Sequence, residues 1–405
     1  MIFPQYQSTS VVNLVSTILK YYGVPNVYPP IPDLTLPPHD RLVYMVIDAL
    51  GYNFLCKYGL HSFLYQSLSP ISQPTNEMTF LQKEWEKNSD QEPYKTNYLT
   101  SVFPSTTASA LTALVTGLAP LQHALTGWYM YYRELGMAGI PLPFLPRCGK
   151  KSFTDLGINI HDLNDFKTIF HLINQSMTVI IPKTIAGSPF ANYCYGDRPQ
   201  KGFTSIEEYF SLIKNELTHT STQIIYAYTP QYDFLCHEYG VDSLQVLDFF
   251  KIIDCLFHDL IEYKDEKTLV ILTADHGMIN TSEEATLNMD DYPDLKSCLI
   301  LPLCGEPRMP YCYVRPSKLD LFRRIIDQRF AQYCQRYSLE EFLRLNAFGL
   351  YHQSPRFWGR VGDEILVMKE NYIFRDYLYP EMRKKLIGCH GGVSADEMFV
   401  PLIIR

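Results

Sequence analysis

The sequence contains no CxxC pair and no apolar run close to the ~20 residues that a membrane-spanning helix needs. Its ten cysteines are spread singly, mostly within apolar segments, which argues against a zinc knuckle or a disulfide framework, although an even number leaves disulfides formally open. Residues 1–23 lack the basic start and the small-residue cleavage site of a signal peptide. We therefore expect free thiols, no membrane span and a cytoplasmic location, with export by a route without a cleavable signal as the alternative.

The chain also lacks an excess of positive charge. Its formal net charge is −8, and the charged residues, 19% of the total, are scattered rather than grouped in blocks. This composition excludes a nucleic-acid coat protein and a basic membrane-binding patch. An anionic ligand would then need a local source of positive charge, which a metal ion supplies compactly. No internal repeat and no low-complexity tract is present.

Apolar residues are abundant and make up 46% of the chain. Many of them lie in segments typical of buried strands. Nearly continuous apolar runs predict parallel strands covered on both faces, at residues 41–50, 98–103, 178–184, 222–229 and 267–274. Helical patterns alternate with them, at residues 10–22, from Ser205 with Glu208 as a capping box, and from Ser243. This alternation predicts a doubly wound α/β sheet, closed by a last strand at 398–404. Ligands of such sheets bind at the carboxyl ends of the strands.

Two segments interrupt the pattern. Residues 128–157 combine aromatic residues with glycine and proline, and residues 279–385 carry prolines and tyrosines between short elements. Within the second segment we expect helices near 317–337 and 338–346 and a strand at 364–374. We predict one catalytic domain over residues 1–405, with 128–157 (the first cap segment) and 279–385 (the second cap segment) as insertions.

The stretch SVFPSTTASALTALVTG, residues 101–117, places three hydroxyl residues directly before an alanine-rich helical run. Hydroxyl side chains commonly cap the first free amides of a helix, so a capped helix start is one interpretation. A nucleophile is the other, because a helix N-terminus gathers amide donors and positive dipole where an attacked phosphate or acyl group needs them. Position alone does not choose among Ser105, Thr106 and Thr107.

Aspartate and histidine follow several of the predicted strands. Any one of them has an ordinary structural explanation, as a turn former, an exposed pair or a core histidine. The set is less ordinary, because all six lie at strand ends or in adjoining loops: Asp48, Asp233, His237, Asp275, His276 and His390. Oxygen and imidazole ligands without thiolates suit zinc or manganese in a hydrolytic site, and six ligands suffice for two ions.

The order of these motifs resembles the alkaline phosphatase superfamily, in its type I phosphodiesterase/nucleotide pyrophosphatase branch. The matching features are an aspartate after the first strand, FPSTTASALTALVTGL, Asp-x-x-x-His, TADHG and a late HGG. The resemblance implies an alkaline-phosphatase-like three-layer α/β/α sandwich and hydrolysis of phosphoric esters through a phosphothreonine. Counting back eight residues from Val115 to the family's nucleophile gives Thr107.

The resemblance also implies cofactors, ligands and a class of substrate. It implies two divalent ions, Zn²⁺ in the first place and Mn²⁺ as the alternative. Asp233, His237 and His390 would hold one ion, and Asp48, Asp275, His276 and Thr107 would hold the other. The partner would be a small phosphate ester, with a nucleotide as one option.

The aromatic residues that follow the predicted nucleophile helix could line a slot for the second ester group, and we take Trp128 and Tyr129 as candidates for substrate binding, with packing of the cap as the alternative. Tyr52 and Asn53, just after Asp48, are further candidates. The resemblance implies that nucleotide-cleaving relatives have asparagine three residues after the nucleophile. This chain has Ala110 there. Phosphomonoesterase, phosphonate hydrolase and a catalytically silent binding module therefore stay as alternatives.

Overall fold

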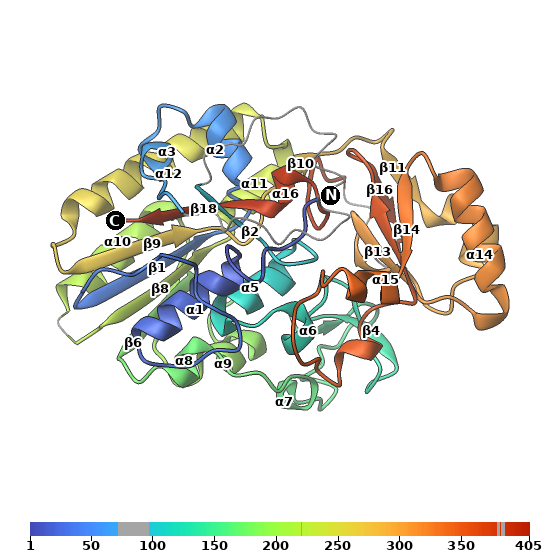
Figure 1. The fold of residues 1–405 in the computed structure, drawn as a ribbon, viewed down its shortest axis with the longest axis horizontal. Coiled ribbons are helices and arrows are strands. Elements are labelled where there is room, and N and C mark those ends of the chain that lie inside the picture. The colour runs from blue at the N-terminus through green and yellow to red at the C-terminus, as the bar shows by residue number, and fades with distance from the viewer. Residues whose placement is uncertain (72–96, 220, 379–380, 382–384) are drawn as a thin grey trace.

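The computed structural model describes residues 1–71, 97–219, 221–378, 381 and 385–405. Its centre is a seven-stranded sheet in the order β2-β18-β9-β1-β8-β6-β7, which Figure 1 shows between two layers of helices. The strands are β1 (Arg41–Ile47), β2 (Tyr98–Thr100), β6 (Met177–Pro182), β7 (Gln200–Phe203), β8 (Ile224–Thr229), β9 (Thr268–Thr273) and β18 (Phe399–Ile404). Every residue of β8 and β9 is buried, as expected of strands covered on both faces.

All six strands predicted for the sheet are present, and β1 pairs in parallel with both β8 and β9. The sequence did not reveal β7, which lies at the edge of the sheet and reads QKGF. An edge strand is only half buried, so it needs no continuous apolar run. The last strand, β18, whose direction the sequence analysis left open, runs antiparallel to β9 and to β2. The hydrophobic pattern reports burial and carries no information about strand direction.

The helices cover both faces of the sheet, which confirms the three-layer α/β/α architecture (Figure 1). One layer contains α1 (Val11–Tyr21) and α5 (Thr107–Thr116), and the other contains α10 (Ile206–Thr218), α11 (Gln231–Tyr239) and α12 (Leu244–Tyr263). As predicted, Ser205 and Ser243 are N-caps, and their side chains accept hydrogen bonds from the amides of Glu208 and Val246. The Glu208 carboxylate accepts hydrogen bonds from the amide and the hydroxyl of Thr204 and so does not complete the capping box.

The two cap segments form small sheets of their own. The first cap segment contains the antiparallel strands β3 (Met130–Tyr132), β4 (Met137–Ile140) and β5 (Leu145–Pro146). The second contains a four-stranded sheet in the order β12-β13-β15-β14, formed by Cys304–Glu306, Met309–Cys312, Glu364–Met368 and Cys334–Ser338. A pair of backbone hydrogen bonds between Tyr129 and Gly305 joins the two segments. The two cap segments are therefore hydrogen-bonded directly to each other.

The second cap segment differs from the prediction in two places. The expected helix over 317–337 comprises α14 (Leu319–Ile325) and a wider turn to Phe330, and the chain then enters strand β14. The expected strand over 364–374 divides into β15 and β16 (Ile373–Arg375), with a turn at Glu370, whose φ is +43°. The polar sequence Lys369-Glu370-Asn371 favours a turn over a continuous strand.

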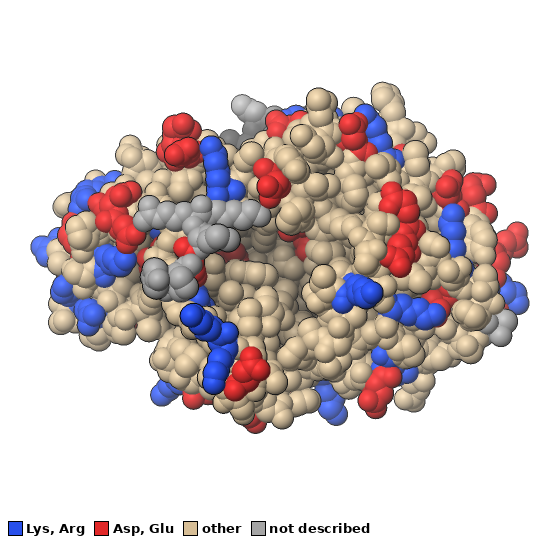
Figure 2. Space-filling model, turned by 180° about the vertical axis from the view of Figure 1, so that it is seen from behind, with Lys and Arg blue, Asp and Glu red and all other residues tan. Residues whose placement is uncertain are grey.

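Figure 2 shows the face opposite to that of Figure 1, on which the surface is hollowed near its middle and charges of both signs are interspersed. All ten cysteines are free; seven are buried, Cys56 is half-buried, and Cys148 and Cys255 are exposed. Among the helices of the described residues, none combines the length and the apolar character needed to cross a membrane.

Candidate active site

The six predicted aspartate and histidine residues meet at the carboxyl ends of three neighbouring strands. Asp48 follows β1, Asp275 and His276 follow β9, and Asp233 and His237 lie one turn apart on α11, which follows β8. His390 comes from the loop after β17 (Gly388–Cys389), a short strand paired with β10 (Ile279–Asn280). Asp48, Asp275 and His276 are fully buried or nearly so, whereas Asp233 and His237 are partly open.

Several of their polar atoms lie close enough to one another to share a cation. His276 Nε2 is 3.4 Å from Asp48 Oδ1 and 3.5 Å from Asp275 Oδ2. Asp233 lies 3.5 Å from His237 Nε2 through Oδ2 and 3.8 Å from His390 Nε2 through Oδ1. In each of two groups of three residues, one ligand atom per residue lies within 4.8 Å of the other two. The groups are Asp48, Asp275 and His276, and Asp233, His276 and His390. His237 lies beside the second group, with its ring 5.1 Å from that of His390.

Two buried aspartates have one oxygen fixed by the protein and another directed at the cluster. Asp48 Oδ2 accepts a hydrogen bond from the Tyr228 hydroxyl at 2.6 Å, and Asp275 Oδ1 accepts from the amides of Ala49 and His276. The other oxygens, Asp48 Oδ1 and Asp275 Oδ2, are buried without a hydrogen-bond partner in the described part of the chain, as is Asp233 Oδ1. Buried acceptors of this kind are costly unless a cation satisfies them, so the donor set fits divalent metal ions.

The three histidines make the same type of contact with the backbone. In each, Nδ1 faces a backbone carbonyl oxygen: Gly388 for His237, Gly277 for His276 and Ser105 for His390, at 2.8, 2.9 and 3.3 Å. A carbonyl oxygen only accepts hydrogen bonds, so Nδ1 carries the proton and the neutral ring keeps a lone pair on Nε2. All three Nε2 atoms therefore suit metal coordination, with their tautomers set by the backbone.

Without a cation, the cluster disfavours ionised carboxylates. Burial raises the pKa of Asp48 well above its usual value, and the negative charges of Asp275 and Asp233 add to that shift. Burial also raises the pKa of Asp275. Burial lowers the pKa of His390, which His276 and His237 lower further. Raised carboxyl pKa values and a lowered imidazole pKa are expected of a buried site that needs positive charge from a bound cation.

The structure separates the three hydroxyl residues before α5. Ser105 Oγ donates to the carbonyl oxygen of Gly392 at 2.7 Å, and Thr106 Oγ1 donates to Glu306 Oε1 at 2.6 Å. Thr107 is the first residue of α5, and its Oγ1 lies 3.1 Å from His276 Nε2. Thr106 occupies the N-cap position, but its side chain makes no capping hydrogen bond. Among the three, therefore, the hydroxyl of Thr107 is the one that faces the metal-ligand cluster.

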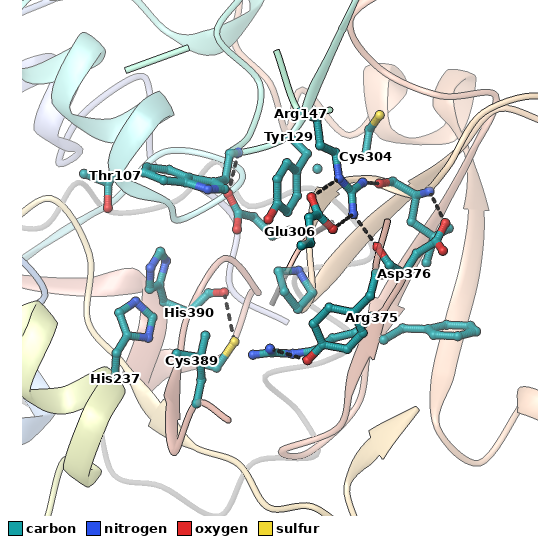
Figure 3. Close-up of a pocket in the computed structure, with 18 of the residues that line it drawn as sticks. Thr107, Tyr129, Arg147, His237, Cys304, Glu306, Arg375, Asp376, Cys389 and His390 are labelled. Carbon is teal, nitrogen blue, oxygen red and sulfur yellow. Dashed lines mark hydrogen bonds and ion pairs between the residues drawn. The ribbon is translucent and has the colours of Figure 1, made fainter. Parts of the chain in front are cut away.

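A cavity of about 300 Å³ opens beside the cluster and extends between the two cap segments (Figure 3). Thr107, His237 and His390 lie on one side of it, and Tyr129, Arg147 and Arg375 on the other. Trp128, Phe374 and Tyr377 add aromatic walls. Arg147 stacks on the Tyr129 ring at 3.9 Å and pairs with Glu381 at 2.9 Å. The cavity thus offers aromatic surface next to Thr107.

The predicted substrate-binding residues fall into two groups. Trp128 and Tyr129 line the cavity beside Thr107. Tyr52 is buried against Tyr98, and Asn53 lines a separate cavity, where it donates to Asp396 at 2.7 Å. Ala110 is fully buried in the main core and is not among the residues that line the cavity.

The sequence analysis missed Glu306, Arg147 and Arg375, which the cap segments bring to the cavity. Glu306 is buried, and burial raises the pKa of its carboxyl group to about 8. No periodic pattern marks these positions, because each lies within or directly after a short strand of a small sheet. A charged residue in an otherwise apolar short strand, as in CGEPRMPYC, is the one signal that could have drawn attention to Glu306.

Comparison with known proteins agrees with this arrangement. The sequence profile of the type I phosphodiesterase/nucleotide pyrophosphatase family matches residues 66–138 and 175–392. No curated protein sequence matches the chain significantly. Among solved structures, murine ectonucleotide pyrophosphatase/phosphodiesterase 5 is similar at 17% identity with a TM-score of 0.63, over 90% of this chain and 88% of that one.

A second similar structure is phosphonoacetate hydrolase from Sinorhizobium meliloti, solved with phosphonoformate. It matches at 16% identity with a TM-score of 0.59, over 92% of each chain. At these identities the likeness shows the fold, which is that of the alkaline phosphatase superfamily, while the sequence profile covers well over half of the chain. The chain therefore belongs to the type I phosphodiesterase/nucleotide pyrophosphatase family and is a hydrolase of phosphoric esters.

Proposed function

We propose that this protein is a metal-dependent phosphodiesterase that hydrolyses small phosphate esters with Thr107 as its nucleophile. One observation carries the proposal: the Thr107 hydroxyl lies 3.1 Å from His276 Nε2, at the N-terminus of α5, and Thr107 lines the aromatic cavity. The neighbouring hydroxyls of Ser105 and Thr106 are engaged elsewhere. The aromatic cavity supports a diester, because the second ester group then has apolar surface to occupy.

We infer the division of the metal ligands from the family resemblance. Asp233, His237 and His390 would hold one ion, and Asp48, Asp275, His276 and Thr107 the other, with Zn²⁺ as the first choice for such oxygen and nitrogen donors. When bound, two divalent ions would supply Lewis-acid stabilisation of negative charge at phosphorus and would lower the pKa of coordinated hydroxyl groups. His276 belongs to both groups of neighbouring ligand atoms, and the family resemblance assigns it to the ion that Asp48 and Asp275 would hold.

The chain's own residues account for the rest of the reaction. The Thr107 hydroxyl gives its proton to solvent and Oγ1 forms a bond to phosphorus, while the bond to the leaving oxygen breaks and that oxygen takes a proton from solvent to leave as the alcohol. Phosphorus then remains bound to Thr107 with its other ester substituent, until water attacks it and loses a proton, the bond to Oγ1 breaks and Oγ1 is protonated again. The amides of the first turn of α5 face the phosphoryl oxygens during both steps.

The proposal is tested with zinc-loaded protein, an aryl phosphodiester, an aryl phosphomonoester and phosphonoacetate. We expect faster turnover of the diester, and acid quenching during turnover should trap the chain with one phosphoryl group at Thr107, detected by mass spectrometry of its peptides. Phosphonate hydrolysis is the second candidate, because the fold is also similar to that of phosphonoacetate hydrolase. Release of phosphate from phosphonoacetate alone would favour it, and no turnover of the three compounds would refute both.

Tyr228 offers a test of the ligand set. Its hydroxyl holds Asp48 Oδ2 at 2.6 Å, which leaves Oδ1 directed at the cluster. Tyr228→Phe removes that hydrogen bond without changing the shape of the buried ring. We expect zinc affinity to fall about 10- to 100-fold, as for other groups that orient metal ligands. Competition with a chromophoric chelator measures this, and an unchanged affinity would contradict the role of Asp48.

A further inference from the structure

The residue before the proposed nucleophile has the backbone of a helix cap but does not act as one. Thr106 is the N-cap of α5, with φ −132° and ψ 148°. At the starts of α9 (Pro189–Tyr195), α10 and α12, the N-cap serine accepts a hydrogen bond from the amide three residues later. The equivalent amide in α5 belongs to Ser109. Thr106 instead directs its hydroxyl at Glu306 Oε1, 2.6 Å away.

Glu306 is held in place from several sides. It is the last residue of β12 and is buried. The oxygen that accepts from Thr106 also accepts from the amide of Trp128 at 2.7 Å. Gly391 packs so tightly against Glu306 that a Cβ at position 391 would lie 2.6 Å from Cβ and Cγ of Glu306. The glutamate therefore connects the second cap segment to the nucleophile turn, to the cavity wall and to the loop of His390.

This contact has a consequence at the start of α5. The amides of Thr107, Ala108 and Ser109 donate no hydrogen bond to the described part of the chain, as is usual for the first turn of a helix without a side-chain cap. An anion beside Thr107 would be the natural acceptor for such amides. A capping hydroxyl would compete with that anion for the amide of Ser109.

We propose that Glu306 is a positioning residue that keeps the Thr106 hydroxyl away from the N-terminus of α5, so that the amides of the first turn stay available to the phosphoryl group. This inference rests on the proposed function of Thr107. Without an acceptor at position 306, the Thr106 hydroxyl loses its partner, and capping of α5 becomes its best alternative. The carboxyl group acts through Thr106 and need not touch the substrate.

The first test compares Glu306→Ala with Glu306→Gln in the zinc-loaded protein. The alanine variant should lower kcat about 10²-fold, as does the loss of one donor that stabilises a developing oxyanion. It should weaken the binding of inorganic phosphate, measured by calorimetry, while the zinc content stays the same. Glutamine keeps an acceptor oxygen for Thr106 and Trp128, so it should recover most of both losses.

The decisive test is a double substitution. Valine at position 106 cannot cap α5, so Thr106→Val combined with Glu306→Ala should have a higher kcat and bind phosphate more tightly than Glu306→Ala alone, by about 10-fold. A rise in KM caused by the lost Trp128 contact should persist in the double variant. The single variant Thr106→Val completes a double-mutant cycle, which measures the coupling between positions 106 and 306. Ser105→Ala is the matched control, because the Ser105 hydroxyl bonds to Gly392, and it should not restore the Glu306→Ala variant.

The inference is overturned if the double variant is no better than Glu306→Ala, or if Ser105→Ala restores that variant equally well. Either result would make Glu306 an ordinary buried bridge between the cap segments. Should Glu306→Ala not fold, Glu306→Met fills a similar volume without accepting a hydrogen bond and takes its place. The phosphate affinities decide the question even if no ester is turned over, so a failure of the proposed function remains distinguishable from a failure of this inference.

Discussion

Replacing Thr107 with alanine is expected to abolish hydrolysis of the phosphodiester, with kcat lowered at least ~10³-fold. The reason is that Thr107 supplies the atom that attacks phosphorus, and the hydroxyls of Ser105 and Thr106 are directed at Gly392 and Glu306. Neither neighbour can substitute without a change in the turn before α5. Steady-state kinetics with zinc-loaded protein measures the loss.

Thr107→Ser is the matched control, because it keeps the hydroxyl and removes only the methyl group. We expect it to retain measurable turnover and to be trapped as the esterified serine after acid quenching. Thermal unfolding should be nearly the same for both variants, since Thr107 lines the cavity and is more exposed than Ala108, Ser109 and Ala110, which follow it in α5. An alanine variant with turnover close to that of the wild type would exclude Thr107 as the nucleophile.

Removal of metal is expected to abolish turnover and to destabilise the protein more at pH 8 than at pH 5. Burial raises the pKa of Asp48 and of Asp275 above the usual value of 3.8. In the metal-free protein, the stability gained from the neutral carboxyl groups is full below that usual value and is lost as the pH rises through the raised pKa. A bound cation removes this cost, because it stabilises the ionised carboxylates.

The measurement is the melting temperature of zinc-loaded and chelated protein across this pH range. At pH 8 we expect a difference of roughly 5 °C or more, from the stabilisation that a tightly bound ligand gives a protein of this size. The difference should shrink toward pH 5. Asp48→Asn is the control, since it should melt higher than the wild type without metal and gain little from zinc. A difference between loaded and chelated protein that does not vary with pH would contradict this account of the cluster.

The sequence alone determined the central architecture and brought the proposed metal ligands to notice. Runs such as 41–50 and 267–274 must be buried because they are continuously apolar, and buried strands that alternate with helices assemble into a covered sheet. Parallel strands bring their carboxyl ends to one edge, so Asp48, Asp233 and Asp275 had to lie close to one another. The family resemblance then selected Thr107 from three hydroxyls that local pattern could not separate.

Tertiary structure alone decided the direction of β18, the edge strand β7 and the partners of the hydroxyl groups. These features depend on contacts between residues far apart in the chain, which leave no periodic trace in the sequence. Thr106 shows this most clearly, because its local sequence is compatible with a helix cap, whereas a carboxyl group 200 positions away accepts the hydrogen bond of its hydroxyl. The same holds for the cavity, whose walls come from both cap segments and meet only when these are folded onto the sheet.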